Sequence, residues 1–365
     1  MPEMGPRSST LTDAEILRLR ELTECIGVSG GEGEVRRMVR QALPRGVGEV
    51  QVDAIGNLMV MCPGRSARRL RVMVAAHLDE VGLMIVAVDE DGRLRFESVG
   101  GINEGQLAGR AVWLGPERVP GVIGAAPPHL AENTEAPPVL RPRDLRIDIG
   151  ADSRSEALAR IRPGMAATIA APFECAEGVL RGKALDDRLG VATLLGLLEH
   201  SFQDIDVLAV FTTQEEVGLR GATAAAHRLR PDLAIVLDCT PARDLPLADG
   251  SPNLFYNTRL GAGPALYTVD ASTISDERLL RLAQSVADEL HLPFQLRQPG
   301  GGSTDAGAIH RSQVGVPSLS ISVPARNLHG SASTARVSDW LAQRALVSGL
   351  LQALTRQAWA GAGSS

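Results

Sequence analysis

The sequence predicts an α/β fold in which helices sandwich a largely parallel sheet, with a small β-barrel-like domain inserted into it. Short, continuous apolar runs rich in β-branched residues are typical of strands covered on both faces. Three such runs occupy residues 71–76, 206–213 and 233–237. Helical periodicity at residues 190–200 and 277–290 alternates with these runs, as expected for an α/β sandwich.

The sequence pattern changes between the first and second of these runs. Residues 93–96 and 111–114 mix polar and apolar side chains, and Asp91-Gly92 is a turn signal. Short, half-exposed strands separated by many turns predict a small barrel. We therefore assign residues 1–88 and 174–365 to a catalytic α/β domain and residues 89–173 to an inserted β-rich domain.

The chain is expected to enter its first helix at Asp13. Thr12 and Glu15 have the spacing of a capping box, and apolar residues follow at helical intervals. A second helix is expected after the glycine-rich turn at 30–33. Such a turn on its own is weak evidence for phosphate binding, so we interpret it as a helix entry.

Composition narrows the class of protein without indicating its chemistry. The 365 residues exceed the usual span of one hydrophobic core, which favours two domains. The 37 basic and 43 acidic residues leave a net charge of −6, which argues against a nucleic-acid or anionic-membrane surface. Residues 1–10 lack the apolar core of a signal peptide, and no apolar run approaches the roughly 20 residues of a membrane span. The four cysteines form no CxxC pair, so we expect reduced thiols in a cytoplasmic protein.

Side chains that can bind a metal ion stand at the ends of the predicted strands. Because ligands gather at the carboxyl ends of strands in open α/β sheets, we expect these residues to converge. They are His77 after the first run, Glu215-Glu216 after the second, Asp238 after the third, Asp186-Asp187 before a helix, and His329 after the apolar run at 319–323.

This mixture of imidazole and carboxylate groups suits zinc and similar divalent ions. Two ions about 3.5–4 Å apart activate a water and polarise a peptide carbonyl. One carboxylate must then bridge the ions, and another must stay off them to accept the proton of the water. Asp79, two residues after His77, is expected to fix the tautomer of that imidazole.

Each of these residues also has a structural explanation when it is taken alone. His77 fits a hydrogen-bonded core histidine, and Asp186-Asp187 fits a helix N-cap. Glu215-Glu216 and Asp238 are harder to explain in this way, because they directly follow strands that should be buried, where an unpaired acid is costly. Their coincidence at several strand ends favours a metal centre.

Seven stretches of the chain resemble the glutamyl aminopeptidase-like family, also called the tetrahedral or TET aminopeptidases. They are residues 53–58, 76–82, 183–190, 213–222, 237–238 and 302–306, together with His329. The resemblance runs over almost the full length and implies a zinc-peptidase-like fold. It also implies a dinuclear metallo-aminopeptidase that removes N-terminal residues from short peptides.

The resemblance implies a role for each site residue. Asp186 would bridge two divalent ions, and Glu215 would be the general base, with the Asp186–Asp187 peptide in the cis form. His77 and Glu216 would complete one metal site, and Asp238 and His329 the other. The ions would be zinc, with cobalt and manganese as alternatives. In the family the inserted domain mediates assembly into dimers and then into a hollow dodecamer, so a homo-oligomer is implied here.

Several alternatives stay open at this point. A metal-dependent carboxypeptidase or deacylase would use the same scaffold, and an endoglucanase-type glycosidase would use two carboxylates without metal. A catalytically silent binding protein is the third alternative. The stretch 324–330 departs from the family beside His329, which leaves the preferred N-terminal side chain open. His129 in the inserted domain and Asp305 in the glycine-rich loop have no assigned role.

Overall fold

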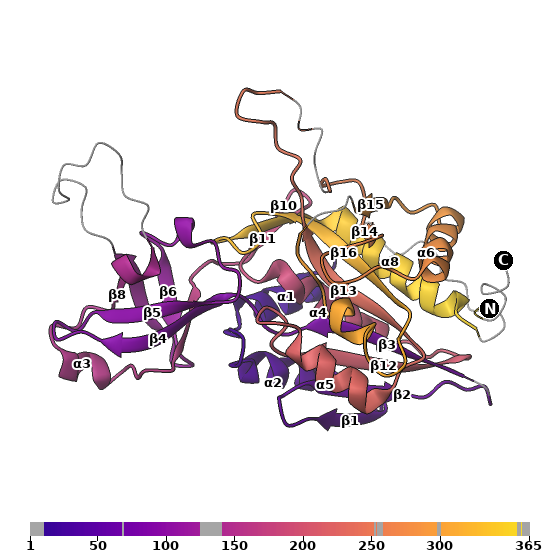
Figure 1. Cartoon of the computed structure of the whole chain (residues 1–365), viewed down its shortest axis with the longest axis horizontal. Coiled ribbons are helices and arrows are strands. Elements are labelled where there is room, and N and C mark those ends of the chain that lie inside the picture. The colour runs from indigo at the N-terminus through magenta and orange to yellow at the C-terminus, as the bar shows by residue number, and fades with distance from the viewer. Residues whose placement is uncertain are drawn as a thin grey trace.

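The computed structural model describes residues 11–67, 69–124, 141–251, 253, 258–297, 301–355 and 359. Figure 1 shows two parts, a broad α/β layer structure and, at one end of it, a separate group of strands that includes β4, β5, β6 and β8. The large sheet is made of 11 strands. They are β1 (Glu49–Val52), β2 (Leu58–Cys62), β3 (Leu70–His77), β10 (Glu174–Ala176), β11 (Val179–Gly182), β12 (Ile205–Thr212), β13 (Leu233–Pro241), β14 (Ala265–Tyr267), β15 (Gln295–Arg297), β16 (Ser318–Arg326) and β17 (Ser333–Arg336).

The centre of the sheet is parallel and its margins are antiparallel. The strand order is β1-β2-β12-β3-β13-β16-β17-β11-β10, with β14 and β15 off this path. Strands β12, β3, β13 and β16 pair in parallel, whereas β2 and β17 join them in antiparallel orientation. The four parallel strands therefore place their carboxyl ends at one edge of the sheet, as the sequence pattern predicts.

Helices cover both faces of this sheet (Figure 1). They are α1 (Asp13–Glu24), α2 (Gly33–Ala42), α4 (Leu185–Leu197), α5 (Arg220–Leu229), α6 (Glu277–Glu289), α7 (Ala306–Ile309) and α8 (Val337–Ala353). Successive residues of β3 reach opposite faces, which is the two-residue period of a strand. Val72 and Val74 pack in one core with residues of α4, α6 and α8, and Met73 packs in a second core with residues of α5 and α7. This double burial explains why the central strands are apolar at nearly every position.

The inserted domain is a closed six-stranded barrel. Its strands, in the order β4-β5-β8-β7-β6-β9, enclose a separate apolar core that contains Leu83, Phe96 and Ile147. The barrel strands are β4 (Gly82–Val88), β5 (Leu94–Val99), β6 (Ala111–Leu114), β7 (Val119–Gly124), β8 (Arg146–Asp148) and β9 (Ala166–Ile169), accompanied by η1 (Glu104–Gln106), η3 (Pro142–Asp144) and α3 (Arg154–Leu158).

The barrel begins earlier than the expected boundary at residue 89. Strand β4 spans Gly82–Val88 and pairs with both β5 and β9, so it closes the barrel. The apolar character of β4 is continuous with that of the catalytic strands, and the first turn signal, Asp91-Gly92, comes only after it. Because the boundary was predicted from the change in the polar and apolar pattern, it was placed one strand too late.

The expected helix entry at Asp13 is confirmed. The Oγ1 atom of Thr12 accepts a hydrogen bond from the backbone N–H of Glu15 at 3.2 Å, and the Glu15 carboxylate accepts one from the Thr12 N–H at 3.0 Å. The second helix, α2, begins at Gly33 after the glycine-rich turn. Within the part of the chain that the structure describes, no helix combines the length and the apolar character that crossing a membrane requires.

Candidate metal centre

The residues expected to bind metal come together at the carboxyl edge of the parallel strands. His77 is the last residue of β3, Glu215 and Glu216 follow β12, and Asp238 lies in the carboxyl half of β13. Asp186 lies at the start of α4, and His329 follows β16. Their ligand atoms fall into groups of three that lie within 4.8 Å of one another. Residues more than 200 positions apart are thus brought to one point by the order of the strands.

Asp186 stands between the two histidines. Its Oδ1 atom lies 3.0 Å from Nε2 of His77, and its Oδ2 atom lies 3.7 Å from Nε2 of His329. Each oxygen of this one carboxylate therefore faces a different imidazole. The Asp186–Asp187 peptide bond is cis, and both residues depart from helical backbone angles at the start of α4.

Three groups of possible ligands share Asp186, and two of them also contain a histidine. One group is His77, Asp186 and Asp238, with His77 Nε2 at 3.9 Å from Asp238 Oδ1. The other is Asp186, Glu216 and His329, with His329 Nε2 at 3.1 Å from Glu216 Oε1. A further group is His77, Glu215 and Glu216, so His77 also lies near Glu216. The expected pairing of His77 with Glu216, and of Asp238 with His329, therefore stays a prediction. His77 and Asp238 lie close together because β3 and β13 are adjacent in the sheet.

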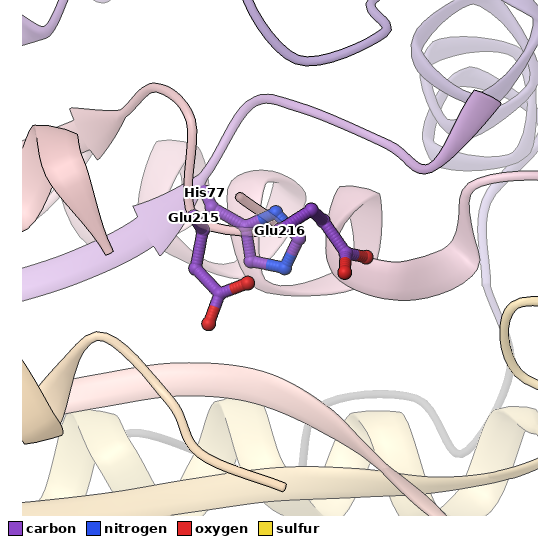
Figure 2. Close-up of side chains that lie close together, drawn as sticks. All are labelled: His77, Glu215 and Glu216. Atoms are coloured by element: carbon purple, nitrogen blue, oxygen red, sulfur yellow. The ribbon is translucent and has the colours of Figure 1, made fainter. Parts of the chain in front are cut away.

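Glu215 and Glu216 are consecutive, yet their carboxylates have different surroundings. Figure 2 shows the two side chains diverging on either side of the His77 ring. The Glu216 carboxylate contacts His329, whereas the Glu215 carboxylate accepts no hydrogen bond from any residue that the structure describes. Both are largely buried, with Glu215 only 8% exposed. The Glu216 carboxylate thus contacts His329, whereas the Glu215 carboxylate lies near His77 and is not in contact with His329 in the described part of the chain.

Asp79 connects the first histidine to the glutamates. Its carboxylate is fully buried and accepts hydrogen bonds from the backbone N–H groups of Glu215 at 3.0 Å and Glu216 at 3.1 Å. The Ser29 hydroxyl donates a third at 2.6 Å. Nδ1 of His77 lies 3.1 Å from the Asp79 carbonyl oxygen and 3.5 Å from its carboxylate. These donors lower the pKa of Asp79 even though its burial acts in the opposite direction.

A second set of hydrogen bonds holds the turn that contains Glu215 and Glu216. The Asn57 side chain accepts a hydrogen bond from the Thr213 N–H at 2.9 Å and donates one to the Gly221 carbonyl at 2.9 Å. Asp53 in turn receives the Asn57 side-chain N–H at 2.7 Å. Asp53 and Asn57 therefore fix both ends of the turn, a role that their separation of more than 150 residues from it conceals in the sequence.

The centre contains more buried carboxylates than imidazoles, which favours the binding of a cation. Burial and the neighbouring acids raise the pKa values of Asp238 and Glu215 well above the usual range of a carboxyl group. They also raise the pKa of Glu216. Burial would lower the pKa of His329, but Asp186 and Glu216 raise it to about 11. The carboxylates in the centre outnumber its two imidazoles, His77 and His329. Imidazole and carboxylate groups together are a donor set that divalent ions prefer. The residues present fit a divalent metal.

Other buried polar groups adjoin the centre, and their roles could not be assigned from the sequence. Lys183 donates to both carboxylate oxygens of Glu80, at 2.7 and 2.8 Å, and Thr168 of the barrel donates to the same carboxylate at 2.9 Å. Asp305 is buried near Glu215 and accepts a hydrogen bond from Thr212 at 2.5 Å, while its other oxygen has no partner among the described residues. His129 lies outside the described residues.

Comparison with protein families shows which family this chain belongs to. A model described as M42 glutamyl aminopeptidase matches residues 56–346, which include all the residues of the centre. The chain belongs to this M42 family. It is accordingly a peptide hydrolase of the metal-dependent aminopeptidase class, whose members use divalent metal ions.

Curated relatives agree with this assignment. A putative aminopeptidase of Acetivibrio thermocellus is 36% identical over 322 residues, covering 88% of this chain and 93% of the relative. A glutamyl aminopeptidase of Lactococcus lactis is 30% identical and a lysyl aminopeptidase of Pyrococcus furiosus 31% identical. The matches cover 93% of this chain and 96% of the first, and 88% of this chain and 92% of the second. Two relatives of similar sequence identity are thus named after N-terminal residues of opposite charge, glutamate and lysine.

Solved structures share the whole architecture. An aminopeptidase from the archaeon Desulfurococcus kamchatkensis superposes with a TM-score of 0.90 at 32% identity, covering 96% of this chain and 98% of that one. A Pyrococcus horikoshii TET1 peptidase, described as able to assemble into a tetrahedron or a large octahedral shell, gives 0.81 at 33% identity, with 93% and 100% covered. A Thermotoga maritima protein described as an endoglucanase gives 0.75 at 29% identity, with 92% and 96% covered. The zinc-peptidase-like fold is therefore confirmed.

Proposed function

We propose that this M42 chain removes N-terminal residues from short peptides with two divalent ions that share Asp186. The observation that carries this proposal is the position of the Asp186 carboxylate, one oxygen of which faces His77 and the other His329. A carboxylate in this position suits a bridging ligand between two ions. His77 and Asp238 would complete the ligands of one ion, and Glu216 and His329 those of the other.

Zinc fits this donor set, and cobalt and manganese are alternatives because the same ligands accept all three. When bound, the two ions would supply a water of lowered pKa and polarise the scissile carbonyl. Asp79 would hold the His77 imidazole in one tautomer through its contacts with Nδ1, so that Nε2 faces Asp186. The preferred N-terminal side chain is left open, because relatives named glutamyl and lysyl aminopeptidase are about equally similar.

Glu215 is the proposed general base. It accepts a proton from the attacking water as the new carbon–oxygen bond forms, and it returns that proton to the amide nitrogen as the carbon–nitrogen bond breaks. Its carboxylate lies beside the cluster near His77, and its pKa is raised; both observations support this role. A carboxylate that already held strong hydrogen bonds would be a poorer proton acceptor.

The barrel is proposed to serve assembly. We assign it to contacts between copies of this chain, first as dimers and then as a dodecamer. A similar TET1 structure is described as a dodecamer, and TET1 is described as able to assemble into a tetrahedron or a large octahedral shell. The catalytic residues would all come from the α/β domain on either side of it in the sequence. Light scattering coupled to size-exclusion chromatography measures this directly, and a monomer at working concentration would contradict it.

Metal analysis combined with a substrate panel tests the proposed activity. We expect two equivalents of divalent metal per chain, activity on aminoacyl-anilides with a free amine, and loss of that activity with a chelator. N-blocked and acyl-amino-acid substrates report a deacylase, and peptides shortened from the other end report a carboxypeptidase. Hydrolysis of glucans that survives chelation would replace the proposal with the glycosidase that the endoglucanase relative suggests.

A further inference from the structure

The two groups of ligands around Asp186 are held in place by different parts of the chain. His77 ends β3 and Asp238 lies in β13, so both belong to the rigid centre of the sheet. His77 is 2% exposed. His329 is 36% exposed at its side chain and lies on the connection after β16, with a left-handed backbone φ of 59°. A ligand on a connecting loop needs an outside support to keep its geometry.

The inserted barrel domain provides that support. Nδ1 of the His329 ring lies 3.2 Å from the carbonyl oxygen of Gly101, which follows barrel strand β5. The backbone N–H of Asn103 donates a hydrogen bond of 2.8 Å to the carbonyl oxygen of His329. The main chain and the ring of His329 are thus both held by residues 101–103.

The same barrel segment packs closely on the second ligand of this group. A methyl group on Gly100 would lie 3.2 Å from Cβ of Glu216, and one on Gly101 would lie 3.1 Å from Nδ1 of His329. Absence of side chains at these two positions lets the barrel backbone approach the site this closely. The segment therefore bounds Glu216 and His329, the two residues that complete one group with Asp186.

The barrel itself is anchored to the catalytic domain by polar contacts away from His329. Thr168 of β9 donates to the buried Glu80 carboxylate at 2.9 Å. Arg118, in the turn between β6 and β7, donates to the Glu24 carbonyl at 3.1 Å and to the Glu34 carboxylate at 2.9 Å. These contacts fix the barrel against the α/β domain, which gives the Gly101 carbonyl a defined place.

We infer that the barrel segment Gly100–Asn103 is a positioning element for the cation held by Glu216 and His329, and that the other cation does not depend on it. Because the Gly101 carbonyl accepts the Nδ1 proton, His329 keeps its Nε2 lone pair directed toward Asp186 and Glu216. The two sites therefore differ in what stabilises them, one by the sheet and one by the inserted domain. This inference rests on the proposed two-ion centre.

The test compares metal binding by Gly101→Ala and Gly105→Ala. The added methyl of Gly101→Ala presses on the His329 ring. That of Gly105→Ala, two residues beyond the segment, is in ordinary contact at 3.4 Å from the Asn103 side chain. Cobalt or zinc is titrated into metal-free protein by calorimetry and equilibrium dialysis, with the cobalt absorption spectrum as a second readout. His329→Ala defines the limit at which one site is lost.

We expect Gly101→Ala to keep one tight site and to bind the second cation roughly 10–100-fold more weakly, which is the usual effect of removing a ligand's outer hydrogen bond. Gly105→Ala should bind both as wild type does. Two sites of wild-type affinity in Gly101→Ala overturn the inference while leaving the two-ion proposal intact. A single site in the wild-type protein overturns both.

A second variant keeps the test decisive if Gly101→Ala does not fold. Asn103→Pro removes the N–H that the His329 carbonyl accepts, at a residue whose φ of −74° is close to that of proline. The same selective weakening of the second cation is expected. Equal weakening of both cations would contradict the assignment of the segment to one site.

Discussion

The carboxylate of Asp79 accepts the backbone N–H of Glu215 at 3.0 Å, although 136 residues separate them in the chain. This bond, with its counterpart from Glu216, couples the end of β3 to the end of β12. The same aspartate contacts Nδ1 of His77. One buried side chain therefore sets the relative positions of a possible ligand and the proposed base.

Replacing Asp79 with Asn should disturb this arrangement without a change in volume. The amide offers one acceptor oxygen in place of two, so one of the two backbone N–H groups loses its partner. We expect kcat/KM and metal affinity each to fall roughly 10–100-fold. Steady-state kinetics and metal titration measure both. Ser29→Ala, which removes only the 2.6 Å hydroxyl contact, is the milder control, and equal losses in the two variants would contradict the account.

The Lys183–Glu80 pair is expected to matter for stability, since both side chains are at most 6% exposed. Lys183→Met leaves the Glu80 carboxylate buried without its main cation, and breaking a buried pair in this way costs about 3–5 kcal/mol. The double variant Lys183→Met/Glu80→Gln should recover part of that loss, because the buried Glu80 carboxylate that lost Lys183 is then neutral. The recovery should be incomplete, because Arg188, 3.6 Å from Glu80 and fully buried, keeps its charge. Urea denaturation measures the free energies of unfolding. A double variant less stable than Lys183→Met would contradict the prediction.

The ion pair between Asp244 and Arg326 predicts a pH-dependent contribution to stability. Burial opposes the shift, but the two contacts from Arg326, at 2.6 and 2.8 Å, lower the pKa of Asp244 below its unfolded value. The stabilisation is therefore present above the unfolded pKa of about 3.9 and is lost as pH falls through the folded pKa.

Asp244→Asn should accordingly be less stable than wild type at pH 7, by about 1 kcal/mol because Arg326 is partly exposed to solvent. The difference should shrink as the pH falls below about 4. Chemical denaturation of both proteins at several pH values measures it. A gap that stays constant, or that widens in acid, would contradict the assignment.

The sequence predicted the parts of the fold that depend on local pattern. The run at 71–76 became β3, and the capping box at Thr12 became the start of α1, because burial on both faces and helix capping leave marks within a few residues. The start of the barrel was placed too late, since β4 is apolar like the catalytic strands and is distinguished from them only by its pairing with β5 and β9.

The residues of the candidate site could be proposed from the sequence one by one, whereas the distances between their side chains depend on the order of the strands. His77 and Asp238 could be proposed from their places at strand ends, whereas their membership in one group depends on the adjacency of β3 and β13. The contact of Gly101 with His329 spans 228 positions and involves a backbone carbonyl, for which the sequence carries no signal. The chemistry of the side chains can thus be read from the sequence. Hydrogen bonds that a distant backbone segment makes to a ligand cannot.

The two adjacent glutamates are proposed to have different roles, Glu215 as general base and Glu216 as metal ligand. Glu215→Gln and Glu216→Gln are matched variants that change one atom at neighbouring positions. The decisive measurement is kcat together with bound metal per chain for both. We expect Glu215→Gln to keep two equivalents of metal while kcat falls about 10²–10⁴-fold, and Glu216→Gln to bind one equivalent more weakly. Near-wild-type kcat in Glu215→Gln, or loss of metal from it, would contradict the account.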